Sequence, residues 1–129
     1  MASAIKKWAG AKTTDFFRMQ NEEVRSAAID PVKKAKAEEA DNYASGLLDA
    51  AAIANTKLKN SEASPYGKKL PLKPVILAFE QAGEALEVAA DAKEEVGEET
   101  RARGLRLIAH AARVSAQKLQ EQARVSGRS

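Results

Sequence analysis

The sequence predicts an all-α protein, elongated and built from two to three long amphipathic helices and a proline-rich linker. Three observations support this fold class. Alanine, which has the strongest helix propensity, makes up 27 of the 129 residues. Two stretches repeat apolar residues at alternating spacings of three and four, the pattern of a helix with one buried face. Three of the four prolines fall into one short segment, residues 60–74, which separates the two stretches.

The same alanine content limits the core that this single domain can build. Ile, Leu, Val and Phe together account for only 25 residues. A buried methyl group contributes about 0.8 kcal/mol, against about 1.5–3 kcal/mol for a larger apolar side chain. The helices should therefore form readily but lack bulky side chains to cover them. We expect them to pack closely, and to do so against another chain.

The first predicted element is an N-terminal amphipathic helix over residues 1–29. Half of the six aromatic residues lie in it, namely Trp8, Phe16 and Phe17. Trp8 and Phe16 share one face of a helical wheel, which Lys12 interrupts. The first 19 residues also carry four basic residues and one acidic residue. Such a segment is typical of a helix that docks on a protein or lies on a membrane surface, and we favour docking.

The second predicted element is a central helix over residues 30–59. Asp30 is a suitable N-cap, and Pro31 suits the first helical position because its missing N–H has no partner there. A heptad seam, made mostly of alanine, is narrow enough for another helix to approach closely; it consists of Ala40, Ala44, Leu47, Ala51, Ala54 and Leu58. Gly46 costs about 1 kcal/mol relative to alanine inside a helix, so we expect a tight helix crossing there.

After the linker, residues 75–129 predict a long C-terminal helix. The apolar faces before and after Gly97 point in nearly the same direction on a helical wheel. We therefore expect one continuous helix over residues 74–123, bent near Gly97–Gly104. A helical hairpin that turns at Gly97 is the alternative. The apolar face follows a second heptad progression with one charged member: Val75, Phe79, Ala82, Leu86, Ala89, Lys93 and Val96.

Charge is divided sharply along this C-terminal region. Residues 80–99 contain eight acids and one base, a net charge of −7, whereas residues 100–129 contain seven bases and one acid, a net charge of +6. An antiparallel pair of such helices sets acid against base. Complementary charge of this kind fixes the orientation and register of a pair more than it adds affinity.

The sequence offers little chemistry for a catalytic site. It contains no cysteine and only one histidine, His110, so it has neither a thiolate nor a histidine cluster for a metal. We expect no enzymatic activity, no metal, no cofactor and no small-molecule substrate. No apolar run reaches the length of a membrane span, and the first twenty residues lack the continuous apolar stretch of a secretory signal. This pattern favours the cytoplasm, or a particle assembled in it.

These observations favour a non-enzymatic assembly protein, a helical building block of a larger complex such as a virus or phage particle. Its partners are copies of itself or other proteins of that complex. We expect the partner interface to use the aromatic segment, the two seams and the glycines: Trp8, Phe16, Phe17, Leu47, Ala51, Ala54, Leu58, Phe79, Leu86, Gly97, Gly104 and Ile108.

Two alternatives stay open. The sequence has an isoelectric point of about 9.2, and its basic C-terminal third suits contact with the phosphates of a nucleic acid. The arginines for that contact are Arg101, Arg103, Arg106 and Arg113. The second alternative is a peripheral membrane protein that binds the bilayer surface through residues 1–19.

Overall fold

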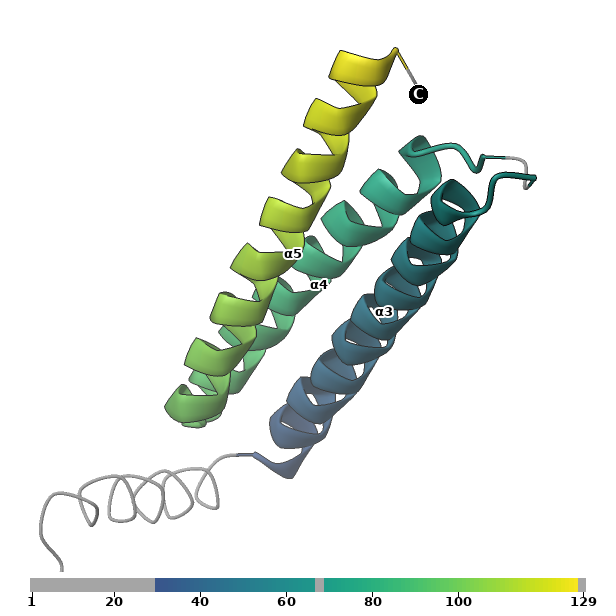
Figure 1. Ribbon diagram of the computed structural model, residues 1–129. Helices are drawn as coiled ribbons and strands as arrows, with labels where there is room; N and C mark the ends of the chain where they lie inside the picture. Colours follow the sequence, from purple (N-terminus) through teal and green to yellow (C-terminus); the bar gives the residue numbers. More distant parts are fainter. Residues whose placement is uncertain (1–29, 67–68, 128–129) are drawn as a thin grey trace, which may run out of the picture.

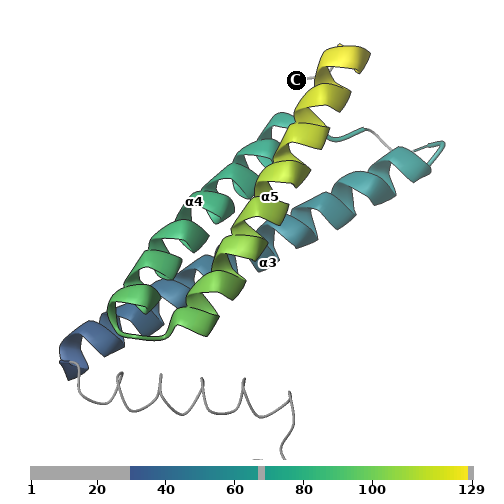
Figure 2. The same cartoon turned by 90° about the vertical axis from the view of Figure 1, so that its left-hand side faces the viewer.

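The computed structural model describes residues 30–66 and 69–127, which form three helices: α3 (Pro31–Ala63), α4 (Lys73–Glu95) and α5 (Glu99–Ser126). The described residues contain no strand, so the predicted all-α fold class is confirmed. α4 runs antiparallel to both other helices and packs against each of them (Figures 1 and 2). The predicted N-terminal helix, with Trp8, Phe16 and Phe17, lies outside the described residues.

Helix α3 begins as the sequence predicts but ends four residues later. The side chain of Asp30 accepts a hydrogen bond from the backbone N–H of Val32 at 2.9 Å, and Pro31 occupies the first turn. The helix ends at Ala63 because Ser64 precedes Pro65, and a proline disfavours the helical conformation at the residue before it. Ser64 is accordingly extended, with φ −82° and ψ 123°. Residues 60–63, predicted as linker, are helical.

The expectation of one continuous C-terminal helix is wrong, and the alternative hairpin at Gly97 is correct. Gly97 has φ 82°, a left-handed conformation that favours glycine. The backbone N–H of Glu98 donates to the carbonyl of Lys93 at 2.9 Å, and that of Gly97 donates to Glu94 at 3.1 Å. These two bonds form a Schellman motif, which satisfies the last carbonyls of α4 and reverses the chain into α5.

The core consists of heptad rows from all three helices, and ten of the 19 apolar residues buried in the described part of the chain are alanine. The small side chains let the helix backbones come close together. The predicted series on α4 is buried along its whole length, from Val75 to Val96, and includes Lys93. On α3, the predicted seam is buried at Ala44, Ala51 and Leu58 and half-buried at its other three positions.

The close helix approach lies at a glycine other than the one predicted. Gly46 is exposed, and a Cβ atom built there would meet nothing within 4 Å. The tight crossing expected at Gly46 is therefore wrong. A Cβ atom on the buried Gly83 of α4 would instead lie 3.2 Å from Cγ of Arg113 and 3.4 Å from the carbonyl oxygen of Ala109. Gly83 thus makes room for the side-chain stem that crosses it from α5.

Candidate functional site

A buried ion cluster joins the three helices next to the α4–α5 turn. Lys93 donates from Nζ to Glu38 of α3 at 2.7 Å and to Glu98 of the turn at 3.0 Å. Arg101 of α5 donates to both carboxylate oxygens of Asp41 at 2.7 and 2.8 Å. The side chains of Lys93 and Asp41 are only 4% and 9% exposed. Each of these two charges is therefore paired, as a buried charge must be.

The environment shifts the pKa values of the cluster toward its charged forms. Hydrogen bonds from Arg101 lower the pKa of Asp41 below its usual value, although burial acts in the opposite direction. Burial would lower the pKa of Lys93, but its bonds to Glu38 and Glu98 outweigh burial and raise that pKa. The cluster is thus ionic around neutral pH and holds α3 against the hairpin.

The cation at the centre of the cluster is the ammonium group of Lys93. It lies 4.0 Å from Oδ2 of Asp41 in addition to its two hydrogen-bonded carboxylates. Within residues 30–66 and 69–127, no group of three or more His, Asp or Glu side chains is arranged to hold a metal ion. The chemistry that this cluster supports is helix pairing. His110, the single histidine, lies exposed on α5 and takes no part in it.

A ladder of polar pairs runs along the outside of the α4–α5 hairpin. Arg113 binds Glu87 with both terminal nitrogens, at 2.5 and 2.7 Å. Gln120 donates to Glu80 at 2.6 Å. Each step moves seven residues back along α4 and seven forward along α5, so the pairs recur once per heptad: Glu94–Arg106, Glu87–Arg113 and Glu80–Gln120. The acid and base blocks therefore pair within one chain and fix its antiparallel register.

Most of the arginines assigned to nucleic acid are bound by this chain's own carboxylates. Arg101 pairs with Asp41, and Arg113 pairs with Glu87. Arg106 binds both Asp91 and Glu94. Of the four, only Arg103 has no ion pair with the part of the chain that the structure describes. A phosphate would have to displace an internal carboxylate at the other three.

The structure divides the predicted partner-interface residues into several groups. Four of them lie in the chain's own core and are not accessible to a second protein: Ala51, Leu58, Phe79 and Leu86. Ala54 and Ile108 are half-buried and pack against that core. Gly97 forms the turn, and Gly104 faces open space within this chain. The alanine seam thus finds its partner helix in the same molecule.

Leu47 belongs to a different feature, an open groove between α3 and α4. This groove has a volume of about 400 Å³ and is lined by Tyr43, Leu47, Gln81, Glu84, Ala85 and Val88. We call it the α3–α4 groove. Tyr43 is 66% exposed and Val88 is 60% exposed, although both are large apolar side chains. Because these two residues face one opening, the groove exposes apolar side chains beside the polar Gln81 and Glu84, and nothing in the described residues covers them.

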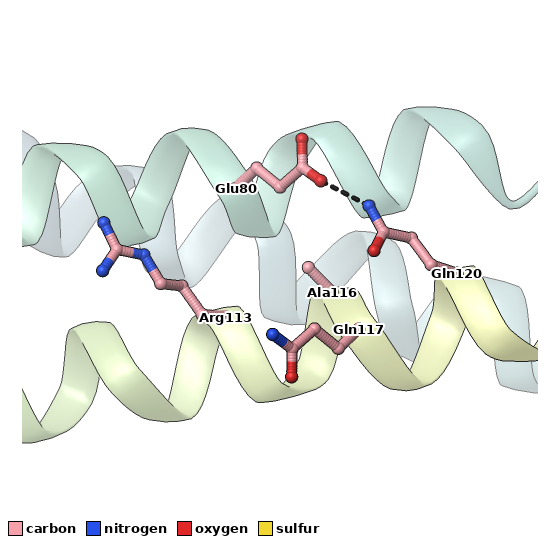
Figure 3. A pocket seen from close by; sticks show the side chains of 5 residues that line it. All are labelled: Glu80, Arg113, Ala116, Gln117 and Gln120. Carbon is pink, nitrogen blue, oxygen red and sulfur yellow. Dashed lines mark hydrogen bonds between the residues drawn. The ribbon is translucent and has the colours of Figure 1, made fainter.

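A smaller pocket of about 230 Å³ lies between α4 and α5, and two of its lining residues, Glu80 and Gln120, bind each other. Figure 3 shows Glu80 and Gln120 reaching across it, joined by their hydrogen bond, with the side chain of Arg113 at its other end. Ala116 and Gln117 complete the lining. This pocket is part of the ladder, because Glu80, Gln120 and Arg113 are all engaged in the pairs between α4 and α5.

Sequence reasoning missed Asp41 and Glu38 and identified Lys93 only as the exception in a heptad row. A lysine in an otherwise apolar row is itself a signal, because it predicts a nearby carboxylate to compensate it. The position of that carboxylate depends on how α3 packs against the hairpin, which the spacing on α3 alone does not give.

No helix within residues 30–66 and 69–127 has the length and apolar character needed to cross a bilayer. The chain matches none of the protein-family models, curated proteins or solved structures with which it was compared.

Proposed function

We propose that this protein is a non-enzymatic assembly protein, a helical building block that joins a larger complex through its α3–α4 groove. The observation that carries the proposal is the pair of exposed side chains Tyr43 and Val88 at one opening. Exposed apolar patches on a folded domain mark sites of protein contact. Copies of this chain, or other proteins of one particle, are the partners we expect.

The rest of the surface supports this choice over nucleic acid. The ladder and the ion cluster engage three of the four arginines that the nucleic-acid alternative needs. Displacing them would cost the pairing that orients the hairpin. The groove, in contrast, has apolar side chains that gain free energy when a partner covers them, about 1.5–3 kcal/mol for each one fully buried.

The test is the mass of the full-length chain in solution, measured by light scattering over a range of concentrations. We expect species well above the monomer mass of 13.8 kDa. The double variant Tyr43→Ala/Val88→Ala should weaken association by about 100-fold, since it removes two apolar side chains from the contact.

The matched control removes two apolar side chains of similar exposure outside the groove, Ile53→Ala/Leu107→Ala. It should associate like the wild type. A wild-type chain that stays monomeric at every concentration, with its helices intact by circular dichroism, would rule out the assembly function.

A further inference from the structure

The α3–α4 groove has a matching ligand in the sequence of this protein. We propose that the groove binds residues 1–19 of a second copy, so that each chain contributes one segment and one groove; this inference rests on the assembly function proposed above. The length of the groove, its charge and the short predicted connection to α3 support this binding mode.

The groove fits the spacing of the two aromatic residues that share a face of the segment. Its α4 side runs from Gln81 to Val88, which are seven positions apart, or about 10 Å along the helix. Trp8 and Phe16 are eight residues apart, which corresponds to about 12 Å in a helix. An amphipathic helix that binds in a groove inserts apolar residues at such spacings. These aromatics are also the bulky groups that the alanine-rich core lacks.

The charges of the groove and the segment are opposite in sign. Glu84 lines the groove, and Glu39 lies one helical turn before Tyr43. Neither glutamate makes a hydrogen bond or ion pair with the part of the chain that the structure describes, although Glu84 lies near enough to Arg113 to help raise the pKa of that arginine. The segment carries Lys6, Lys7, Lys12 and Arg18 against Asp15, a net charge of +3. This complementarity favours a basic helix over an acidic one in the groove.

The connection to α3 favours binding to a neighbouring copy. The sequence predicts a helix up to residue 29, and α3 begins at Pro31 with Asp30 as its N-cap. If the predicted helix extends to residue 29, only Asp30 separates it from α3, whereas an antiparallel helix pair needs a loop of about 2–5 residues. The segment is therefore not expected to fold back along the α3 of its own chain. A contact in which one copy's segment fills the next copy's groove is head-to-tail, and it produces rings or filaments.

The first experiment blocks each side of the contact in the full-length chain. The groove variant Glu84→Lys/Val88→Lys places two positive charges opposite the basic segment. The segment variant Phe16→Ser/Phe17→Ser removes two aromatic residues and retains Trp8. Each variant alone should lose association, with the dissociation constant raised about 100-fold or more. The matched control Asp49→Lys/Ile53→Lys makes the same changes with the same spacing on the exposed side of α3 and should assemble normally.

The decisive measurement mixes the two blocked variants. The segment variant has a free groove and the groove variant has a free segment, so an equimolar mixture should form a species of twice the monomer mass that grows no further. A mixture that stays monomeric overturns the inference, as does a segment variant that assembles like the wild type. If the segment variant assembles like the wild type but the groove variant does not, the assembly function stands and the choice of residues 1–19 as the ligand of the groove is wrong.

Trp8, the only tryptophan, provides an independent signal. Its fluorescence emission should shift to shorter wavelength in the assembled wild type and return to that of a solvent-exposed indole on dilution. The groove variant should show the exposed emission at all concentrations. A short-wavelength emission that persists in monomeric wild type means that the segment packs within its own chain, which contradicts the proposal.

Discussion

The pairing of Asp41 with Arg101 gives a direct test of how α3 is held on the hairpin. The change Asp41→Asn keeps the size of the side chain and removes its charge. Asp41 accepts two charge-assisted hydrogen bonds from Arg101, at 2.7 and 2.8 Å. Bonds to charged groups contribute about 1.5–3 kcal/mol each. The guanidinium is 46% exposed and regains water when the pair is lost, so we expect the net loss of stability to be about 2 kcal/mol.

Urea denaturation followed by circular dichroism measures this loss. It should be done at one fixed protein concentration, because association raises the apparent stability. The control is Asp49→Asn, also on α3, where the side chain is exposed and makes no bond with the described residues. That change should stay within about 0.5 kcal/mol of the wild type.

A double-mutant cycle with Arg101→Gln separates the pair from other effects. If the loss of stability comes from the Asp41–Arg101 pair, the double variant should be only slightly less stable than Asp41→Asn alone. The coupling energy between the two substitutions should then be about 1 kcal/mol or more. If Asp41→Asn proved as stable as Asp49→Asn, the charge of the buried carboxylate would contribute nothing to the packing of α3, contrary to this prediction.

Three further predictions concern the helices, the core and pH. Gly46→Ala should raise the free energy of unfolding by about 0.8–1 kcal/mol, because the new methyl meets nothing within 4 Å. Gly83→Ala should raise it by less, because its methyl would lie 3.2 Å from the Arg113 side chain. Denaturant titration of both variants measures the two changes. Leu86→Ala should lose about 2–5 kcal/mol from the core, whereas the exposed Val88→Ala should change the stability of the monomer by less than about 0.5 kcal/mol; equal losses would contradict the burial pattern. Since the pKa of Asp41 is lowered from 3.8, its charged form stabilises the fold above pH 3.8 and this contribution is lost as the pH falls below that value. The stability difference between wild type and Asp41→Asn should therefore narrow in that acidic range, and a difference that stays constant there would show that Asp41 is not its source.

Periodicity predicted the buried faces well and the path of the chain poorly. The heptad row from Val75 to Val96 was correct at each position, because burial along a helix follows directly from its 3.6-residue period. The predicted direction of the chain after Gly97 was wrong, because two helices that pack face to face can show the same wheel phase as one continuous helix. The left-handed conformation of Gly97 decides between these structures, and apolar spacing carries no information on it.

The charge pattern predicted the pairing but not the molecule in which it occurs. The expected antiparallel match of acid and base is present within one chain, as the pairs Glu94–Arg106 and Glu87–Arg113 of the ladder. The alanine seam was likewise expected to pack against another chain, and in the structure it packs against α4 of the same molecule. The ion cluster was harder to foresee, because the burial of Asp41 depends on contacts between residues 60 positions apart.

The fully buried alanines of this bundle have a consequence for how its sequence can vary. Six alanines of the described residues are 0% exposed: Ala44, Ala51, Ala82, Ala89, Ala90 and Ala109. Adding even a few methylene groups in so tight a space costs about 1–3 kcal/mol, as much as many deletions of larger groups. Homologous chains should therefore replace leucines by other bulky residues more freely than they enlarge these six positions.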